Sequence, residues 1–259
     1  MDLRELNPAV KGLAVILCVL LLSFALNPVT PLLTLAATVI VTWSFGRVSW
    51  GRWLLLFAPF LLAACSYMAA TVLFPRESMA PSPVLLQLGG FEVTRAAAEL
   101  AASLGLRVLA FSALSLLFIL TTDPTRLMLS LMQQCRMPPK LAYGILAGYQ
   151  FLPLMQEEFR ILRTAQRVRD GGFRRSRNPL LQLHRTAIPL LAGAIRKAER
   201  VSAAMVSKGF TDSPYRTFYK RVRVTAADWL FLALMVGIVL LSYLAAWRLG
   251  YTRLYNGEL

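Results

Sequence analysis

Long apolar runs constrain this chain more than any other feature. About 20 consecutive apolar residues span a bilayer as a helix, and stretches near that length occur at 13–26, 29–45, 53–74, 104–120 and 229–247. Hydrophobic residues make up 57% of the 259 residues, far above the usual share in a soluble domain. The sequence therefore predicts an all-α, polytopic membrane protein with about five spans.

The boundaries of these spans follow from local signals. Asn27-Pro28 is a turn-forming pair between two runs that are each short alone, so the first two spans are expected to form a hairpin. The alanine-rich stretch 93–102 is expected to extend the fourth span upstream as helix. Residues 144–155 are the one place where a further span could be hidden. The first run has no small-residue cleavage site after it, so we expect it to remain in the mature protein.

Charge sets the expected orientation. The formal net charge is +15, and basic residues in membrane proteins gather on cytoplasmic segments. The basic residues that flank the first three spans on one side are Arg4, Lys11, Arg47 and Arg52. We expect these and the long basic middle segment to be cytoplasmic, although Arg248 and Arg253 would then lie outside. Nucleic-acid binding is the less favoured explanation of the charge.

The residues that could carry chemistry are scattered. They are Cys18, Cys65, Cys135, His184, Glu157 and Glu158. None has a partner at metal-ligand spacing, and the two glutamates lie among arginines that favour a salt-bridged, solvated helix face. The chain also has no Gly-x-x-x-x-Gly-Lys-Ser/Thr phosphate loop. We therefore expect no metal site, no disulfide, no cofactor and no catalytic activity in this chain.

The polar middle predicts three helices. Asp123 is placed to cap a helix over 124–134, which ends before the prolines at 138 and 139. A long helix over 140–169 follows, with Pro153 inside it and Gly171-Gly172 after it. A second long helix over 180–208 contains Pro189 and is expected to end at Gly209. The two long helices are each apolar early and charged late, which predicts an antiparallel amphipathic pair at the membrane face.

Basic residues concentrate at the ends of these two helices. Arg160, Arg163 and Arg167 recur at three and four residues, on one face. Arg169 and Lys208 close the two helices. Cations in a last turn also offset the helix dipole and bond the free carbonyls, which alone would explain either residue. Two matched basic ends in one membrane protein instead indicate a docking surface.

Five short stretches follow one another along the chain: Asn7-Pro8-Ala9-Val10-Lys11, Thr121-Thr122-Asp123-Pro124, Met137-Pro138-Pro139-Lys140, Phe151-Leu152-Pro153-Leu154 and Ala165-Gln166-Arg167. In this order they resemble stretches of the transmembrane T component of energy-coupling factor transporters, the EcfT/CbiQ-like family. The resemblance covers nearly the whole chain, and the combination is far more specific than any single stretch. It implies a non-catalytic membrane subunit with a cytoplasmic pair of long coupling helices.

The resemblance assigns roles to particular residues. Family members carry two Ala-Arg-Gly-like motifs at the ends of the coupling helices, each docking on one ATPase. The docking residues implied here are Arg167, Arg169, Asp170, Ser207, Lys208 and Gly209. The second motif departs from the pattern because lysine lacks the planar fork with which arginine binds a carboxylate in two places. We therefore expect that contact to be weaker, or matched by a variant ATPase.

Small residues on the apolar faces are a second candidate surface. Gly144 and Gly148 are spaced as Gly-x-x-x-Gly, which lets another helix approach closely in lipid. The set implied for contact with a substrate-capturing S component is Gly144, Gly148, Ala192, Gly193 and Ala194. Ordinary packing within the chain is an equally good explanation of the same residues.

The family also implies the partners and the place of action. We expect two ABC-type ATPases that bind the ATP, an S-component membrane protein, membrane lipid and no nucleic acid, in a bacterial or archaeal inner membrane. The expected division is 1–120 and 227–259 as transmembrane helices, with 121–226 as coupling helices. The transported vitamin or metal belongs to another subunit, with a thiamine precursor the weakly favoured substrate. The alternatives are an ordinary ABC permease and a non-transport membrane scaffold.

Overall fold

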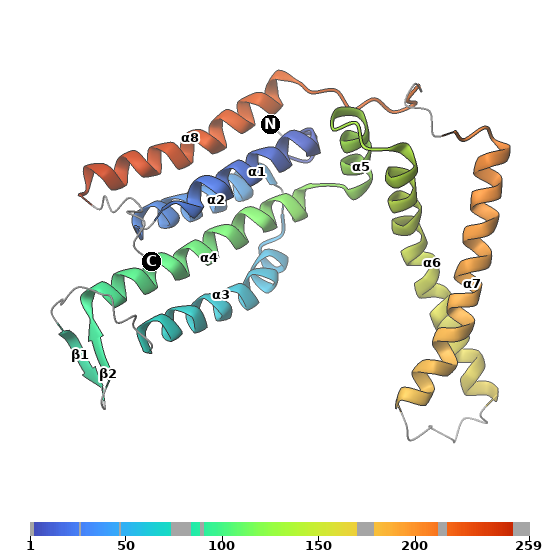
Figure 1. Ribbon diagram of the computed structural model, residues 1–259, viewed down its shortest axis with the longest axis horizontal. Coiled ribbons are helices and arrows are strands. Elements are labelled where there is room, and N and C mark those ends of the chain that lie inside the picture. The colour runs from blue at the N-terminus through green and yellow to red at the C-terminus, as the bar shows by residue number, and fades with distance from the viewer. Residues whose placement is uncertain are drawn as a thin grey trace. The chain divides into compact units, whose positions relative to one another are not determined.

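A computed structural model describes residues 3–25, 27–46, 48–73, 84–88, 91–169, 179–211 and 217–250 (Figure 1). Its helices are α1 (Pro8–Ser23), α2 (Val29–Gly46), α3 (Trp50–Leu73), α4 (Arg95–Thr121), α5 (Pro124–Gln134), α6 (Pro139–Arg169), α7 (Pro179–Ser207) and α8 (Ala226–Arg248). The chain divides into two compact units, one formed by Met1–Ser130 with Val222–Leu259 and the other by Leu131–Arg221. We call them the membrane unit and the hairpin unit.

The membrane unit contains the predicted spans. Among the described residues, four helices are long and apolar enough to cross a bilayer, namely α2, α3, α4 from Ala97 and α8, and α1 is a shorter apolar helix of 16 residues. The all-α, polytopic prediction is thus confirmed, with the count of five spans approximate. Residues 144–155 belong to α6, which is not among the candidate spans of the described chain. The three-part division and the orientation stay predictions.

A short β-hairpin precedes α4. Strands β1 (Val84–Leu88) and β2 (Phe91–Thr94) pair antiparallel, with Leu88 opposite Phe91. The helix expected from residue 93 therefore begins at Arg95. Valine, threonine and phenylalanine favour strand, and this local preference outweighed the helical signal of the alanines that follow.

Helix α4 is the centre of the membrane unit. It packs along α2 and α3 and touches α1, while α8 covers α1 and α2. The apolar core lies where these helices meet and includes Ala14, Cys18, Leu22, Leu114, Leu117, Met235 and Val239. By contrast, α3 buries only 6% of its apolar window, so most of its surface remains available to lipid or to another protein.

Threonines form a polar ladder along the buried face of α2. Thr34, Thr38 and Thr42 each donate their hydroxyl to the carbonyl oxygen four residues earlier, at 2.7–2.8 Å. All three are at most 4% exposed. Because each hydroxyl is satisfied within its own helix, the stripe can be buried without the cost of unpaired polar groups.

A buried lysine holds one end of the membrane unit together. The Nζ of Lys11 donates to the carbonyl oxygens of Leu3 (2.5 Å) and Thr121 (3.1 Å) and to the Thr121 hydroxyl (3.2 Å). The Thr122 hydroxyl lies at 3.5 Å. Lys11 is only 1% exposed, so it is an internal anchor rather than the surface charge expected from its place beside a span. Two of the sequence motifs, around residues 11 and 121, therefore meet here.

An adjacent carboxylate joins the start of α8 to the same place. Asp228, 2% exposed, accepts hydrogen bonds from the backbone N–H of Asn7 at 2.6 Å and of Thr225 at 2.7 Å. The Asn7 side chain in turn caps α1 by accepting from Ala9 N–H. The starts of α1 and α8 and the end of α4 are thereby fixed together, as expected for helices that enter and leave on the same side.

Helix α5 leaves from this network. The Asp123 carboxylate accepts from the Thr125 N–H at 3.0 Å, which confirms the predicted N-cap. Arg126 donates to the carbonyl oxygens of Arg4 at 2.8 Å and Glu5 at 3.1 Å. After α5, Arg136 adopts a left-handed φ of 52°, which stops the helix before Pro138 as the sequence predicts. The last residues of α5 belong to the hairpin unit, so this helix links the two units.

We expect Lys11→Met to destabilise the protein. The substitution leaves the buried carbonyl oxygens of Leu3 and Thr121 without the lysine donor, a loss of about 2 kcal/mol, which corresponds to a melting temperature lower by roughly 4–8 °C. Thermal unfolding in mild detergent measures it. Arg52→Met removes an exposed cation and serves as the control. Equal melting temperatures for the two variants would contradict the anchoring role.

Candidate functional site

The candidate site lies on the hairpin unit, where α6 and α7 cross (Figure 1). Glu158 of α6 forms an ion pair with Lys197 of α7, and both side chains are 29% exposed. Farther along α6, Gln166 Nε2 donates to the Arg185 carbonyl oxygen at 3.1 Å and its Oε1 accepts from the Thr186 hydroxyl at 3.2 Å. Residues later in α6 meet residues earlier in α7, so the pair is antiparallel as predicted.

The two predicted docking ends point in opposite directions along this pair. Arg169 ends α6 eleven residues beyond Glu158, and Ser207 ends α7 ten residues beyond Lys197. At 1.5 Å per residue, each end lies about 15 Å beyond the crossing along its own helix. The structure therefore does not bring the two motifs into one site. It places two separate basic ends on the two sides of one helix crossing.

The end of α7 is fixed by a Schellman motif. Gly209 has a φ of +78°, its N–H donates to the Val206 carbonyl oxygen, and the Phe210 N–H donates to the Met205 carbonyl oxygen, both at 2.9 Å. This pair of hydrogen bonds is the pattern of a glycine-terminated helix. It confirms the predicted end of α7. Lys208 is exposed at that stop.

The end of α6 presents its arginines to solvent. Arg167 and Arg169 lie in the last turn and are exposed, and Val168 between them is 77% exposed. Asp170, the third residue of the first motif, lies outside the described residues, as does the predicted Gly171-Gly172 stop.

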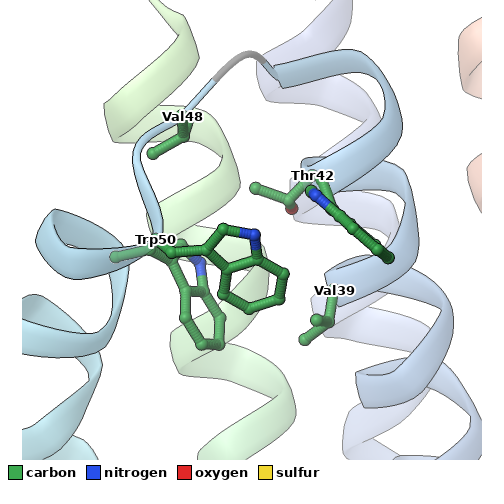
Figure 2. Close-up of a pocket in the computed structure, with 6 residues that line it drawn as sticks. Val39, Thr42, Val48 and Trp50 are labelled. Carbon is green, nitrogen blue, oxygen red and sulfur yellow. The ribbon is translucent and has the colours of Figure 1, made fainter.

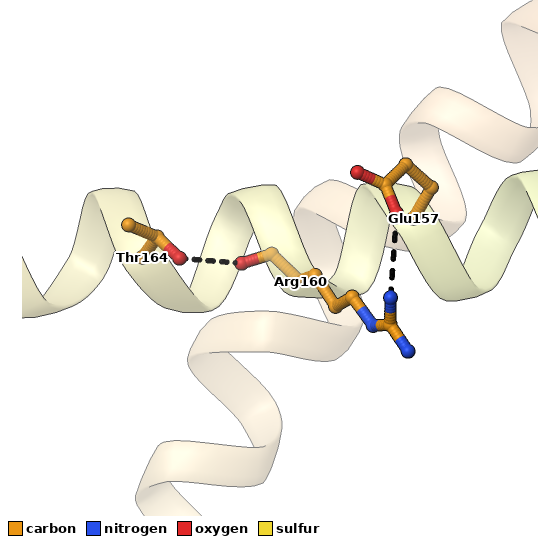
Figure 3. A network of polar contacts seen from close by, with 3 residues as sticks. All are labelled: Glu157, Arg160 and Thr164. Atoms are coloured by element: carbon orange, nitrogen blue, oxygen red, sulfur yellow. Dashed lines mark hydrogen bonds and ion pairs between the residues drawn. The ribbon is translucent and has the colours of Figure 1, made fainter.

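A basic face runs along α6 toward this end. Its open surface is lined by Gln156, Phe159, Arg160, Arg163, Thr164 and Arg167. Figure 3 shows Arg160 paired with Glu157 at 3.8 Å and its carbonyl oxygen accepting from the Thr164 hydroxyl at 3.0 Å. The Arg163 guanidinium lies 5.0 Å from the centre of the Phe159 ring. The predicted common face of Arg160, Arg163 and Arg167 is confirmed, and Phe159 is an addition that charge spacing did not reveal.

A shallow depression precedes Lys208 on α7. It is lined by Ala198, Glu199, Ser202, Ala203, Val206 and Ser207. Ala198, Ser202, Ala203 and Ser207 have small side chains, so the surface of this helix face is shallow. Val206 at its edge is 67% exposed. This depression was not predicted from the sequence, although the spacing of its small side chains was the available signal. Lys208 thus comes directly after a shallow, partly apolar helix face on which another protein could pack.

The small residues of the second candidate surface fall into two groups. A Cβ added to Gly193 would lie 3.5 Å from Oε2 of Glu158, an ordinary van der Waals contact, so this residue faces α6 at the crossing. A Cβ added to Gly144 or Gly148 meets no atom of the described chain within 4 Å. Ala192 and Ala194 are half-buried. Gly193 therefore lies at a contact within the chain, whereas the Gly-x-x-x-Gly face is open.

The residues that the structure describes form no metal site. No three His, Cys, Asp or Glu side chains gather there in a way that could hold a metal ion. His184 is exposed on α7.

Comparison with known proteins covers most of the chain. The model of the CbiQ family, described as "Cobalt transport protein", matches residues 2–219. The energy-coupling factor transporter transmembrane protein EcfT of Streptococcus equi is 26% identical over 90% of this chain and 88% of its own length. That of Streptococcus thermophilus is 24% identical, with 93% of both chains covered. The Leuconostoc gelidum protein of the same name is 28% identical over 62% of this chain, which spans 64% of that relative.

We expect the Glu158–Lys197 pair to hold the crossing. Glu158→Lys should raise the rate of amide hydrogen exchange across the middle of α7, because two cations then oppose each other and local opening becomes easier. The double swap Glu158→Lys/Lys197→Glu should restore slow exchange. Hydrogen-exchange mass spectrometry measures both.

The neighbouring Glu157 supplies the matched control, since its pair with Arg160 is largely exposed and such pairs contribute little. Glu157→Lys should leave exchange in α7 unchanged. If Glu157→Lys and Glu158→Lys act alike, or the swap does not restore exchange, the ion pair does not hold the helices together.

Proposed function

The chain belongs to the CbiQ family and is the transmembrane T component of an energy-coupling factor transporter, and on that premise we propose that it couples two cytoplasmic ATPases to a separate substrate-capturing membrane subunit. The T component is a non-catalytic subunit of the transporter. In this proposal ATP is bound and hydrolysed by the partners, the chain itself holds no cofactor, and the complex works in the inner membrane of a bacterium.

The observation that supports this best is the pair of basic helix ends directed away from a common crossing. A single docking site for one protein would be served by neighbouring charges. Here Arg169 and Lys208 each end a separate helix, on opposite sides of the Glu158–Lys197 crossing. Each end offers a cation beside an exposed aliphatic side chain, Val168 or Val206. Two such ends suit two ATPase subunits, one on each.

The crossing explains how movement would be transmitted. If ATP binding brings the two ATPases closer, each pulls on one helix end, and the antiparallel pair changes its crossing. The ion pair and the Gln166 hydrogen bonds join the two helices at the crossing, so displacement of one helix is passed to the other. Helix α5 is continuous between the units and is tied to residues 4 and 5 by Arg126, which gives the motion a path to the membrane unit.

The open face of α6 is the proposed contact for the S component. Gly144 and Gly148 have no neighbour in the described chain, while exposed Leu141, Ile145 and Leu152 provide apolar surface beside them. Close approach of another helix to small residues is a common way for membrane proteins to associate. The cargo of that subunit would be a vitamin or a metal micronutrient, with a thiamine precursor as the first substrate to test.

Charge reversal at both helix ends should release the ATPases. We expect Arg169→Glu/Lys208→Glu to lower co-purification of the ATPases from native membranes at least ten-fold, because each replacement places a like charge against the acidic acceptor that a cation would bind. Quantitative mass spectrometry of the tagged chain in mild detergent measures the loss. Membrane insertion and the S component should be retained.

The control for this experiment reverses one exposed arginine on each helix away from the ends. Arg160→Glu/Arg196→Glu makes the same change in net charge and should leave ATPase recovery within about two-fold of the unmodified chain. Unchanged ATPase recovery after the Arg169 and Lys208 reversal would remove these residues from the docking role.

Filling the glycine face should release the S component instead. Gly144→Leu/Gly148→Leu adds bulk where no atom of the described chain lies, and leucine is the better helix former, so folding and ATPase recovery should persist. We expect recovery of the small membrane subunit to fall at least five-fold. Gly237→Leu, at an equally open glycine of α8, should have no effect. Loss of both partners alike, or of neither, would argue against a separate S-component surface.

A further inference from the structure

A recess lined by aromatic rings lies between the end of α2 and the start of α3. Its lining residues are Val39, Thr42, Trp43, Val48, Trp50 and Trp53, around a space of about 20 Å³. Figure 2 shows Val39 and Thr42 on α2 facing Trp50 at the start of α3, with Val48 in the connection between them. Both helices pack along α4, and the recess occupies the space that remains between them.

The indole rings form a wall held by ring contacts. Trp43 and Trp50 meet edge to face with centres 5.4 Å apart, and Trp50 and Trp53 do so at 6.4 Å. Trp53 also stacks on Phe57 at 4.6 Å. Trp43 and Trp50 are 64% and 47% exposed, whereas Trp53 is 8% exposed. The first two therefore form the mouth and the third lies at the inner side.

The buried ring carries an unused hydrogen-bond donor. Nε1 of Trp53 is buried and has no acceptor in the described chain. The nearby Thr42 hydroxyl donates to the carbonyl oxygen of Thr38. A buried N–H without a partner is costly, and indoles usually find one. The missing acceptor is therefore expected from a molecule that enters the recess.

The lining defines the chemistry of that molecule. None of the six side chains is charged, which disfavours a phosphate or carboxylate and favours a neutral carbonyl oxygen. The apolar walls favour methylene groups next to it. A water molecule there needs two to four polar partners, and Thr42 is the one polar side chain of the lining that is not aromatic. The space is also smaller than the usual pocket for a whole small-molecule ligand.

The position of the recess indicates where the molecule that enters it comes from. It lies at the ends of two membrane-spanning helices, where tryptophans gather at the depth of the lipid headgroups. Around it Ile40, Leu54 and Leu55 are 58%, 54% and 74% exposed, as expected of a surface in contact with acyl chains. The ester carbonyls of a phospholipid lie at this depth, directly above the first methylenes of its chains.

We propose that this recess binds one phospholipid by its ester region. An ester carbonyl oxygen accepts the hydrogen bond from Trp53 Nε1, and the first methylenes of that acyl chain pack against Trp43, Trp50 and Val39. The bound lipid bridges α2 and α3 where the two helices lack extensive contact of their own. This inference rests on membrane embedding alone and is independent of the coupling proposed for α6 and α7.

The test compares two lipids that differ only in the acceptor. The full-length chain, stripped of lipid in mild detergent, is titrated with dioleoylphosphatidylethanolamine and with its diether analogue, which lacks both carbonyl oxygens. Native mass spectrometry gives the occupancy of bound lipid. We expect the ester lipid to bind at least five-fold more tightly, the loss expected when a buried donor is left unpaired.

Two variants test whether Trp53 causes the preference for the ester lipid. Trp53→Phe keeps an aromatic ring and removes the N–H, so it should bind the two lipids equally. Trp229→Phe, at a 58% exposed position of α8, should keep the ester preference. Equal binding of the two lipids by the unmodified chain, or an ester preference that survives Trp53→Phe, would overturn the proposal. The first of these comparisons needs no variant, so it holds even if a substitution impairs folding.

Discussion

The buried ammonium group of Lys11 is the interaction on which the arrangement of the membrane unit depends. A lysine that is 1% exposed survives burial only when its three protons are accepted. Here they bind the carbonyl oxygens of Leu3 and Thr121 and the Thr121 hydroxyl. With Asp228 bound to the Asn7 N–H beside it, the group fixes α1, α4 and α8 at the end from which α5 departs. A helix that is to carry motion needs such a fixed base.

The helices of the polar middle were predictable because their limits are local. Proline and glycine punctuate the sequence there, and α5 begins and ends at the predicted residues 124 and 134. The Gly209 stop and the exposure of Arg167, Arg169 and Lys208 also follow from neighbouring residues alone. Asp170 is the one docking residue that lies outside the described chain.

The remaining features depend on contacts between distant segments. Lys11 meets a hydroxyl 110 positions away, so the sequence showed only a cation beside an apolar run. The recess around Trp53 depends on the folded positions of α2 and α3, and the place of Gly193 opposite Glu158 depends on the crossing of α6 and α7. The β-hairpin was missed for a different reason, since an alanine-rich stretch beside it gave the stronger periodic signal. Local sequence signals predict the helices and the residues where they end. Contacts between residues far apart in the sequence determine what those helix ends can do.

The proposed coupling subunit has a fixed base where α5 departs, a crossed helix pair and a separate partner at each helix end. The most direct test is the stoichiometry of the complex purified intact from native membranes, measured by native mass spectrometry. The account predicts one copy of this chain with two ATPase subunits and one small membrane protein that carries the substrate. Two copies of this chain with two ATPases and no such membrane protein would contradict it, because each copy would then form its own substrate path.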